Sequence, residues 1–422
     1  MRRLLLGGGV AVLLAVVLLV VGTVSGSPDK PVAKAPVKLT AIARAQEQLK
    51  RTPTDFRTWA ALSIAYTSQA KLTVDPSYYA KAEGAAARSL AIDAKTNDLG
   101  YAALAAVRLA QHEFPAALEA ARKGLAINGF SSTLYGALGD AYTQLGRYAD
   151  ATKAVDRMNQ LQPGVPAFTR ASYVFELRGD VPQARAALER ALQDAASPPD
   201  VAFARTYLGE LSLNYGGDAT AALREFEAGL AADPTDISLK AGRAKALAAL
   251  GRTREALTAY QELVSSVPQP QYVLEYAELL QAQHDPAADR QYALFRTLED
   301  LFRANKVVLD TEPTLFEADH GSPAKALAYA RAGWKTRPFL EMADAYGWAL
   351  YVNKQYAAAR AWSNRALATG WTNALFHFHR GMILTALGDK GSARTELQRA
   401  LSLNPHFNVL QAPQARAALA AL

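Results

Sequence analysis

One cluster of acidic and imidazole side chains has the residue types needed to bind a metal ion. Glu317, Asp319 and His320 fall within four residues, and Glu317 and His320 share one face of a helix. A metal-dependent hydrolase is the enzyme hypothesis that this cluster allows. The other interpretation is structural, because Gly321 is a typical helix stop and a new helix begins just after it. We favour this helix-end interpretation.

A second pair, His377-x-His379, has a spacing that does not suit a shared metal ion. Side chains two residues apart on a helix point about 200° away from each other, so the two rings cannot converge. We interpret both histidines as packing or surface residues.

Other signatures of catalysis and cofactor binding are missing from the sequence. The chain has no cysteine, which excludes disulfides, thiolate metal sites, cysteine nucleophiles and a lipid anchor on an N-terminal cysteine. It contains no H-E-x-x-H, P-loop, G-x-S-x-G or calcium-loop motif. The run Gly7-Gly8-Gly9 lies inside a hydrophobic stretch, where it cannot bind a phosphate. We therefore predict that the protein is not an enzyme and has no metal or cofactor.

The elements that must position any functional side chain are helices with a long-range repeat. From about Thr52 onward, Ala, Leu, Arg, Glu and Gln dominate, and apolar residues recur at spacings of three and four. Glycines that interrupt the helical stretches and prolines that close them are separated by gaps near multiples of about 34 residues. These residues are Gly146, Gly179, Gly216, Gly251 and Gly388, and Pro163, Pro234, Pro268, Pro338 and Pro405.

Within this period the chain repeats one motif. Its best copy reads Tyr135-x2-Leu138-Gly139-x2-Tyr142, then Ala151-x3-Val155, then Pro163. Partial copies are Trp59-x2-Leu62-Ser63-x2-Tyr66, Ala222-x3-Phe226, Ala256-x3-Tyr260, Ala326-x3-Ala330, and Gly381-x2-Leu384 with Ala393-x3-Leu397. The motif resembles the tetratricopeptide repeat. The resemblance implies an all-α protein, a right-handed α-solenoid of nine or ten stacked helix-turn-helix units between Thr54 and Phe407.

Small residues have a packing role in this motif. Gly139 and Ala151 lie where the two helices of a unit approach closely, and Tyr142 and Val155 fill the space beside them. The sequence departs from the motif at residues 72–79, which are inserted in the first unit, and in an irregular segment near 285–320. Residues 414–422 are predicted to form a C-terminal capping helix.

The resemblance also implies a concave groove, lined by the first helix of each unit, that binds a partner peptide or helix. Laying the motif on the sequence gives the partner-binding candidates Asp140, Thr143, Gln144, Tyr173, Glu176, Glu210, Lys245, Trp348, Tyr351 and Met382. This set lacks the paired Lys and Asn residues with which chaperone-binding members hold a C-terminal carboxylate. Three of the candidates, Tyr173, Trp348 and Tyr351, have the alternative of being inter-helix core residues.

The N-terminal 25 residues predict a membrane segment. Arg2 and Arg3 precede 21 uncharged residues, Leu4 to Val24, long enough to cross the hydrocarbon core. We favour an uncleaved anchor with the body outside the cytoplasm; the alternative is a cleaved signal peptide and a secreted protein. Residues 26–51 form a Pro/Lys/Ala linker and lead-in, and residues 52–422 form the solenoid.

Net charge argues against a nucleic-acid partner. The chain carries +7, but residues 1–51 hold +6 of it, which leaves +1 for the rest. Nucleic-acid binding needs many clustered Lys and Arg contacts, and the solenoid has no such stripe. The sequence therefore predicts an extracytoplasmic, membrane-tethered scaffold that binds protein partners, with a glycan or lipid receptor as the alternative and the metal-dependent hydrolase as a less favoured one. The oligomeric state stays open.

Overall fold

The computed structural model describes residues 40–308 and 311–422, and these residues form 22 α-helices and no β-strand. The helices are α1 Ala41–Arg51, α2 Phe56–Thr73, α3 Ser77–Ile92, α4 Asp98–Ala110, α5 Phe114–Ile127, α6 Ser132–Gln144, α7 Tyr148–Leu161, α8 Val165–Glu176, α9 Val181–Gln193, α10 Pro198–Asn214, α11 Ala219–Ala232, α12 Ile237–Ala249, α13 Thr253–Ser266, α14 Pro270–Ala282, α15 Ala287–Ala304, α16 Thr311–His320, α17 Pro323–Thr336, α18 Leu340–Val352, α19 Tyr356–Ala366, α20 Ala374–Ala386, α21 Lys390–Leu403 and α22 Gln411–Ala421.

The predicted N-terminal hydrophobic helix, residues 4–24, and most of the predicted linker lie outside the described residues. In the part that the structure describes, no helix has both the length and the apolar character needed to cross a membrane.

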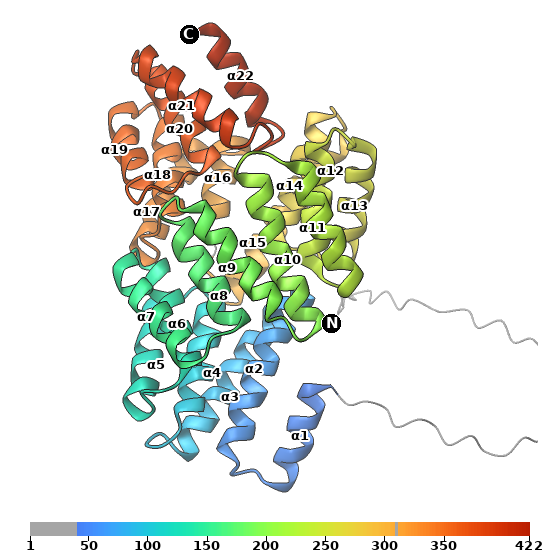
Figure 1. The fold of residues 1–422 in the computed structure, drawn as a ribbon, viewed down its shortest axis with the longest axis vertical. Coiled ribbons are helices and arrows are strands. Elements are labelled where there is room, and N and C mark those ends of the chain that lie inside the picture. Colours follow the sequence, from blue (N-terminus) through green and yellow to red (C-terminus); the bar gives the residue numbers. More distant parts are fainter. Residues whose placement is uncertain (1–39, 309–310) are drawn as a thin grey trace, which may run out of the picture. The chain divides into compact units, whose positions relative to one another are not determined.

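Consecutive helices pair as hairpins along the described chain, from α2 with α3 to α20 with α21 (Figure 1). Ten hairpins stack in sequence order, and from α4 to α20 each first helix except α16 also packs closely on the preceding second helix. Helix α1 packs on α2, and α22 packs on α20 and α21. The prediction of an all-helical solenoid built from helix-turn-helix units is thus confirmed.

Helix starts follow from local side-chain chemistry. Eleven of the described helices begin after a Thr, Asp, Asn or Ser whose side-chain oxygen accepts a hydrogen bond from a free backbone N–H of the first turn. For example, the Oδ1 atom of Asp236 accepts the N–H of Leu239 at 2.8 Å. Such a cap stabilises a helix by about 1 kcal/mol, so these residues set where the repeat units begin.

Close helix approach depends on small residues in the hairpins. A Cβ atom at Gly139 would lie 3.0 Å from Val155 Cγ2 and 3.7 Å from the Ala151 carbonyl oxygen, which confirms the predicted close approach of the two helices at Gly139 and Ala151. In the α10–α12 region, the fully buried ring of Phe226 lies between Gly209 and Gly242, and a Cβ at either glycine would come within 2.4 Å of that ring. Side chains here interlock without room for an added methyl group.

Extra residues in the two irregular segments lengthen helices more than loops. The inserted residues 72–79 extend α2 to 18 residues, and α3 begins three residues after the left-handed Val74. In the segment near 285–320, α15 also has 18 residues and α16 has ten. Helix α22 buries Ala415 together with Leu397 and covers the last hairpin.

The solenoid returns on itself, so that loops of its second half contact turns of its first half. The N–H of Val308 donates to the carbonyl of Gln111 at 3.2 Å, the N–H of Leu340 to the Tyr148 hydroxyl at 3.1 Å, and the N–H of Gly216 to the carbonyl of Leu403 at 2.7 Å. The separation along the chain is close to 190 residues each time, roughly five and a half repeats. We call this line of contacts the seam.

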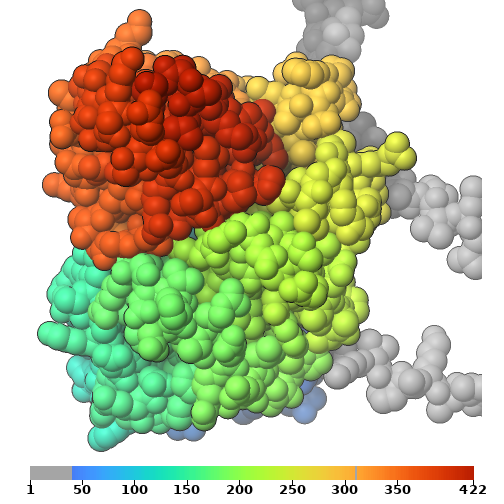
Figure 2. Space-filling view, turned by 45° about the horizontal axis from the view of Figure 1, so that its top comes forward, coloured from blue at the N-terminus to red at the C-terminus, as the bar shows by residue number. Residues whose placement is uncertain are grey.

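Apolar side chains reinforce the seam. Leu177 at the end of α8 shares a buried cluster with Phe339, Trp371 and Phe376, which come from the second half of the chain. In the space-filling view, the orange and red C-terminal helices lie directly on the green segment that contains α6 to α10 (Figure 2). Because the seam has its own hydrophobic core, it holds the solenoid closed and turns the first helices of the hairpins toward a shared interior.

Candidate functional site

The first helices of the hairpins line an interior surface, which we call the inner groove and define by α6, α8, α10, α12, α14 and α16. Its first part is a cavity of about 410 Å³ between α6, α8 and α10, here called the aromatic pocket. The pocket is lined by Gly139, Asp140, Thr143, Val155, Thr169, Arg170, Tyr173, Val174, Phe203 and Tyr207. Three of the predicted groove residues, Asp140, Thr143 and Tyr173, therefore meet in one cavity.

Two exposed aromatic residues are the main feature of this pocket. Phe203 and Tyr207 lie one turn apart on α10, in an edge-to-face arrangement with ring centroids 5.0 Å apart. Each side chain is 44% exposed, although both residues line a concave surface. Exposed aromatic side chains in a cavity are typical of binding surfaces. Neither residue was among the sequence-predicted candidates, although both precede Glu210 on the same helix face and so follow from the same motif register.

Charged groups rim the aromatic pocket. The guanidinium of Arg170 forms a two-pronged ion pair with Asp140, at 2.9 Å through Nε and 2.8 Å through Nη2. Burial lowers the pKa of Lys71 at the end of α2, while the Asp140 carboxylate acts in the opposite direction. Bidentate pairing fixes the Arg170 guanidinium against the Asp140 carboxylate.

Glu176 is the next groove carboxylate along the chain. Its Oε1 accepts the Tyr215 hydroxyl at 2.7 Å, and that hydroxyl in turn accepts Trp371 Nε1–H at 2.9 Å across the seam. Burial raises the pKa of Glu176 to about 7, and the nearby Glu210 carboxylate adds to this effect. Tyr173, on the same helix, packs edge-to-face against Trp371 and belongs to the apolar cluster of the seam.

Lys245 lies between two carboxylates further along the groove. Its Nζ is 3.5 Å from Glu210 and 3.5 Å from Glu275, and Glu275 also accepts the Tyr260 hydroxyl at 3.1 Å. Burial alone would lower the pKa of Lys245, but the two carboxylates raise it above its usual value. The predicted groove residues Glu210 and Lys245 thus contact each other, 35 residues apart on neighbouring first helices.

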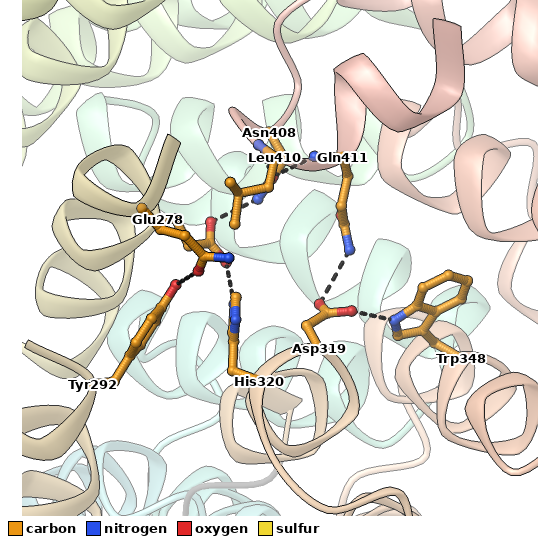
Figure 3. A network of polar contacts seen from close by, with 9 residues as sticks. Glu278, Tyr292, Asp319, His320, Trp348, Asn408, Leu410 and Gln411 are labelled. Carbon is orange, nitrogen blue, oxygen red and sulfur yellow. Dashed lines mark hydrogen bonds and ion pairs between the residues drawn. The ribbon is translucent and has the colours of Figure 1, made fainter. Parts of the chain in front are cut away.

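The far part of the groove is crossed by residues 404–410, which we call the C-terminal strap. Asn408 Nδ2 donates to Glu278 at 2.7 Å, and the same carboxylate contacts His320 Nε2 at 3.1 Å. Gln411 Nε2, at the start of α22, donates to Asp319 at 3.1 Å (Figure 3). Cavities of about 340 and 140 Å³ remain beside the strap. The strap therefore ties the C-terminus to α14 and α16.

The remaining predicted groove residues pack elsewhere. Trp348 is 5% exposed, and its ring stacks between Tyr351, with centroids 4.5 Å apart, and His379, at 4.1 Å. Both faces of the indole are covered, so no open face is left for a sugar or lipid. Met382 joins the same cluster, and Gln144 accepts Arg337 Nε at 2.5 Å at the seam. These side chains are covered by neighbouring helices, whose positions the motif alone does not predict.

The candidate metal cluster does not converge. Glu317 accepts the N–H of Ser322, the N-cap residue of α17, at 2.7 Å, while Asp319 accepts Trp348 Nε1–H and His320 contacts Glu278. The helix-end interpretation of Glu317 is confirmed by this contact. Within residues 40–308 and 311–422, no group of three His, Cys, Asp or Glu side chains has the geometry to hold a metal ion.

The two spaced histidines turn to different helices. His377 contacts Glu396 on α21 at 2.5 Å, and the fully buried His379 contacts Asp344 on α18 at 2.7 Å.

The stacked hairpins and their interior groove define a helical-repeat protein. Residues 374–407, which contain α20 and α21, match a family model described as tetratricopeptide repeat. This match identifies one tetratricopeptide repeat, and the same helix-hairpin unit recurs along the described chain. No curated protein matches the chain.

Several solved structures share its fold to a limited extent. A thermophilic tetratricopeptide repeat protein from Thermus thermophilus is 24% identical over 40% of this chain and 91% of its own, with a TM-score of 0.37. Pseudomonas aeruginosa PilF is 17% identical over 49% and 95%, with a TM-score of 0.39. The human IFIT1 dimer is 14% identical over 86% and 87%, with a TM-score of 0.47. Similarity at this level carries no functional argument.

Proposed function

We propose that the solenoid is a protein-interaction scaffold that binds a partner segment in the aromatic pocket of the inner groove. The observation that carries the proposal is the exposed pair Phe203 and Tyr207 inside a cavity of about 410 Å³. Packing the two aromatic rings against apolar side chains of a partner would supply several kcal/mol of binding free energy, because each Å² of buried apolar surface contributes about 25 cal/mol. Charged groups around the pocket would orient that segment.

The proposed mechanism is geometric. The seam closes the solenoid, so the first helices of the hairpins present a preformed surface that changes little on binding. A preformed groove avoids the cost of ordering loops when the partner arrives. The scaffold would therefore hold its partner at a defined position without acting chemically on it.

We also propose that this scaffold is held at a membrane with its body outside the cytoplasm. The support is the sequence of Arg2 and Arg3 followed by the apolar run Leu4 to Val24. Cleavage after this run would give a secreted protein instead. Fusing a periplasmic reporter enzyme to the C-terminus tests the topology, and membrane extraction at alkaline pH separates an anchored from a released chain.

The groove proposal is tested by placing a photoreactive amino acid at Phe203 in the full-length protein in its native membrane. Phe130 is a matched control, because it is 76% exposed and lies outside the aromatic pocket. Adducts to one or two defined proteins at Phe203, and not at Phe130, would support the scaffold. Equal labelling at both positions, or no adduct at Phe203, would contradict it.

A further inference from the structure

Carboxylates follow one another along the inner groove from repeat to repeat. They lie on first helices α8, α10, α14 and α16, and we call them the carboxylate ladder. Its members are Glu176, Glu210, Glu275, Glu278 and Asp319. Among the described residues, the one Lys or Arg in an ion pair with the ladder is Lys245. The ladder therefore keeps a net negative charge even when His320 is protonated.

The central members of the ladder are accessible to water. The side chain of Glu210 is 29% exposed and that of Glu275 is 23% exposed. Both share the single ammonium of Lys245 at 3.5 Å, which is longer than a strong charge-assisted hydrogen bond. Each carboxylate can accept about four hydrogen bonds, so oxygen lone pairs remain open toward the groove.

The C-terminal strap gives an independent indication of what the ladder binds. This segment is not helical; it connects α21 to α22 and crosses the groove on the way. It is held by side-chain N–H donors, from Asn408 to Glu278 and from Gln411 to Asp319 (Figure 3). The groove thus already holds one non-helical segment of this chain, a series of turns, through side-chain N–H donors on ladder carboxylates.

We infer that the partner is a basic peptide segment, with Lys or Arg side chains on Glu210 and Glu176 and an apolar side chain in the aromatic pocket. This inference rests on the proposed function and names the chemistry of the partner. A Lys or Arg supplies the N–H donors that Asn408 supplies to Glu278, together with a positive charge that an amide lacks. The carboxylates Glu176 and Glu210 follow the pocket along the groove, on α8 and α10, so the basic side chains lie on the Glu210 side of the pocket.

The overall charge of the helical part cannot produce the same preference. Residues 1–39 contain five basic and one acidic side chain, which leaves +3 of the total +7 for residues 40–422. A protein with this net charge would weakly attract acidic peptides. A measured preference for basic peptides therefore reports the local field of the ladder.

The test uses three fluorescent peptides of about ten residues with the same Leu and Pro content, whose charged positions are all Lys, all Glu or all Gln. Their binding to the full-length protein is measured by fluorescence anisotropy at pH 8, above the pKa of Glu176. At low salt, the Lys peptide is expected to bind at least about tenfold more tightly than the Glu peptide, and added salt should reduce that ratio. Glu210→Gln should weaken the Lys peptide by roughly three- to tenfold. Glu227→Gln, an exposed carboxylate on α11, should change it by less than about twofold.

Equal binding of the Lys and Glu peptides, or an equal loss in the Glu210 and Glu227 variants, would overturn the inference. Photocrosslinking at Phe203 separates this result from the proposed function. Partner adducts at Phe203 without a Lys preference would refute the charge rule and leave the scaffold standing. A Lys preference that depends on Glu210, with no protein adduct at Phe203, would support the ladder and refute the scaffold.

Discussion

Gly146 lies against the backbone of Pro338, 192 residues further along the chain. A Cβ atom at Gly146 would be 2.5 Å from the Pro338 carbonyl oxygen, closer than any real contact of this kind. The same relation joins Gly179 to Gly370, where the distance would be 2.4 Å. Glycine at these turns therefore serves the seam as well as the hairpin.

The seam predicts a graded effect of alanine at equivalent glycines. Gly146 and Gly251 both have positive φ, 70° and 72°, but nothing lies within 4 Å of the Gly251 Cβ position. Gly251→Ala should cost about 1 kcal/mol, the usual strain of an L side chain there. Gly146→Ala adds a backbone clash and should cost at least about 1 kcal/mol more. Urea denaturation of both variants measures the difference, and equal losses would mean that the seam does not constrain Gly146.

We expect removal of the Glu176 carboxylate to stabilise the protein at high pH but not at low pH. Its pKa is raised from 4.5 to about 7 in the folded protein, chiefly by burial, so the folded state favours the protonated form. Its contribution to stability is fully present below pH 4.5 and is lost as pH rises through 7. Glu176→Gln should therefore raise the free energy of unfolding at pH 8 by on the order of 2 kcal/mol relative to wild type, seen as a higher Tm, and change it little near pH 4.5. Calorimetry at both pH values checks this, and a larger gain at the acidic pH would contradict it.

Two phenylalanines should separate binding from folding. Phe203→Ala removes an exposed groove ring and should change the free energy of unfolding by less than about 0.5 kcal/mol while abolishing partner capture at a nearby photoreactive Tyr207 position. Phe226→Ala removes a fully buried ring and should cost about 3–5 kcal/mol. Circular dichroism melts and cross-linking yields are the readouts. A large stability loss at Phe203 would show that the ring is a core element.

The strap predicts a local effect at the C-terminus. Asn408→Ala removes the amide that donates to Glu278 and leaves that carboxylate with the His320 contact alone. Hydrogen exchange in residues 404–421 should then become faster, roughly tenfold for a loss of about 1.4 kcal/mol. Exchange in α6 to α10 should be unchanged. Ser402→Ala on α21, whose hydroxyl bonds only within its own helix, is a suitable control.

The motif register predicted many of the residues that line the groove. The residues Asp140, Tyr173, Glu176, Glu210 and Lys245 come from successive first helices, and the structure places them along one interior surface. Trp348 comes from the same register but is covered by Tyr351 and His379. A periodic pattern assigns a helix face, whereas the exposure of that face depends on the neighbours that cover it.

The sequence by itself determined the repeat: its helices, its period near 34 residues, its capping residues and the small residues within hairpins. These are local properties, since caps and i, i+4 packing need only a few neighbouring residues. Only the tertiary structure decided that the solenoid closes on itself after about 190 residues, that Phe203 and Tyr207 stay exposed, and that the strap crosses the groove. Small rotations between hairpins add up over five or six units, and no local pattern records their sum.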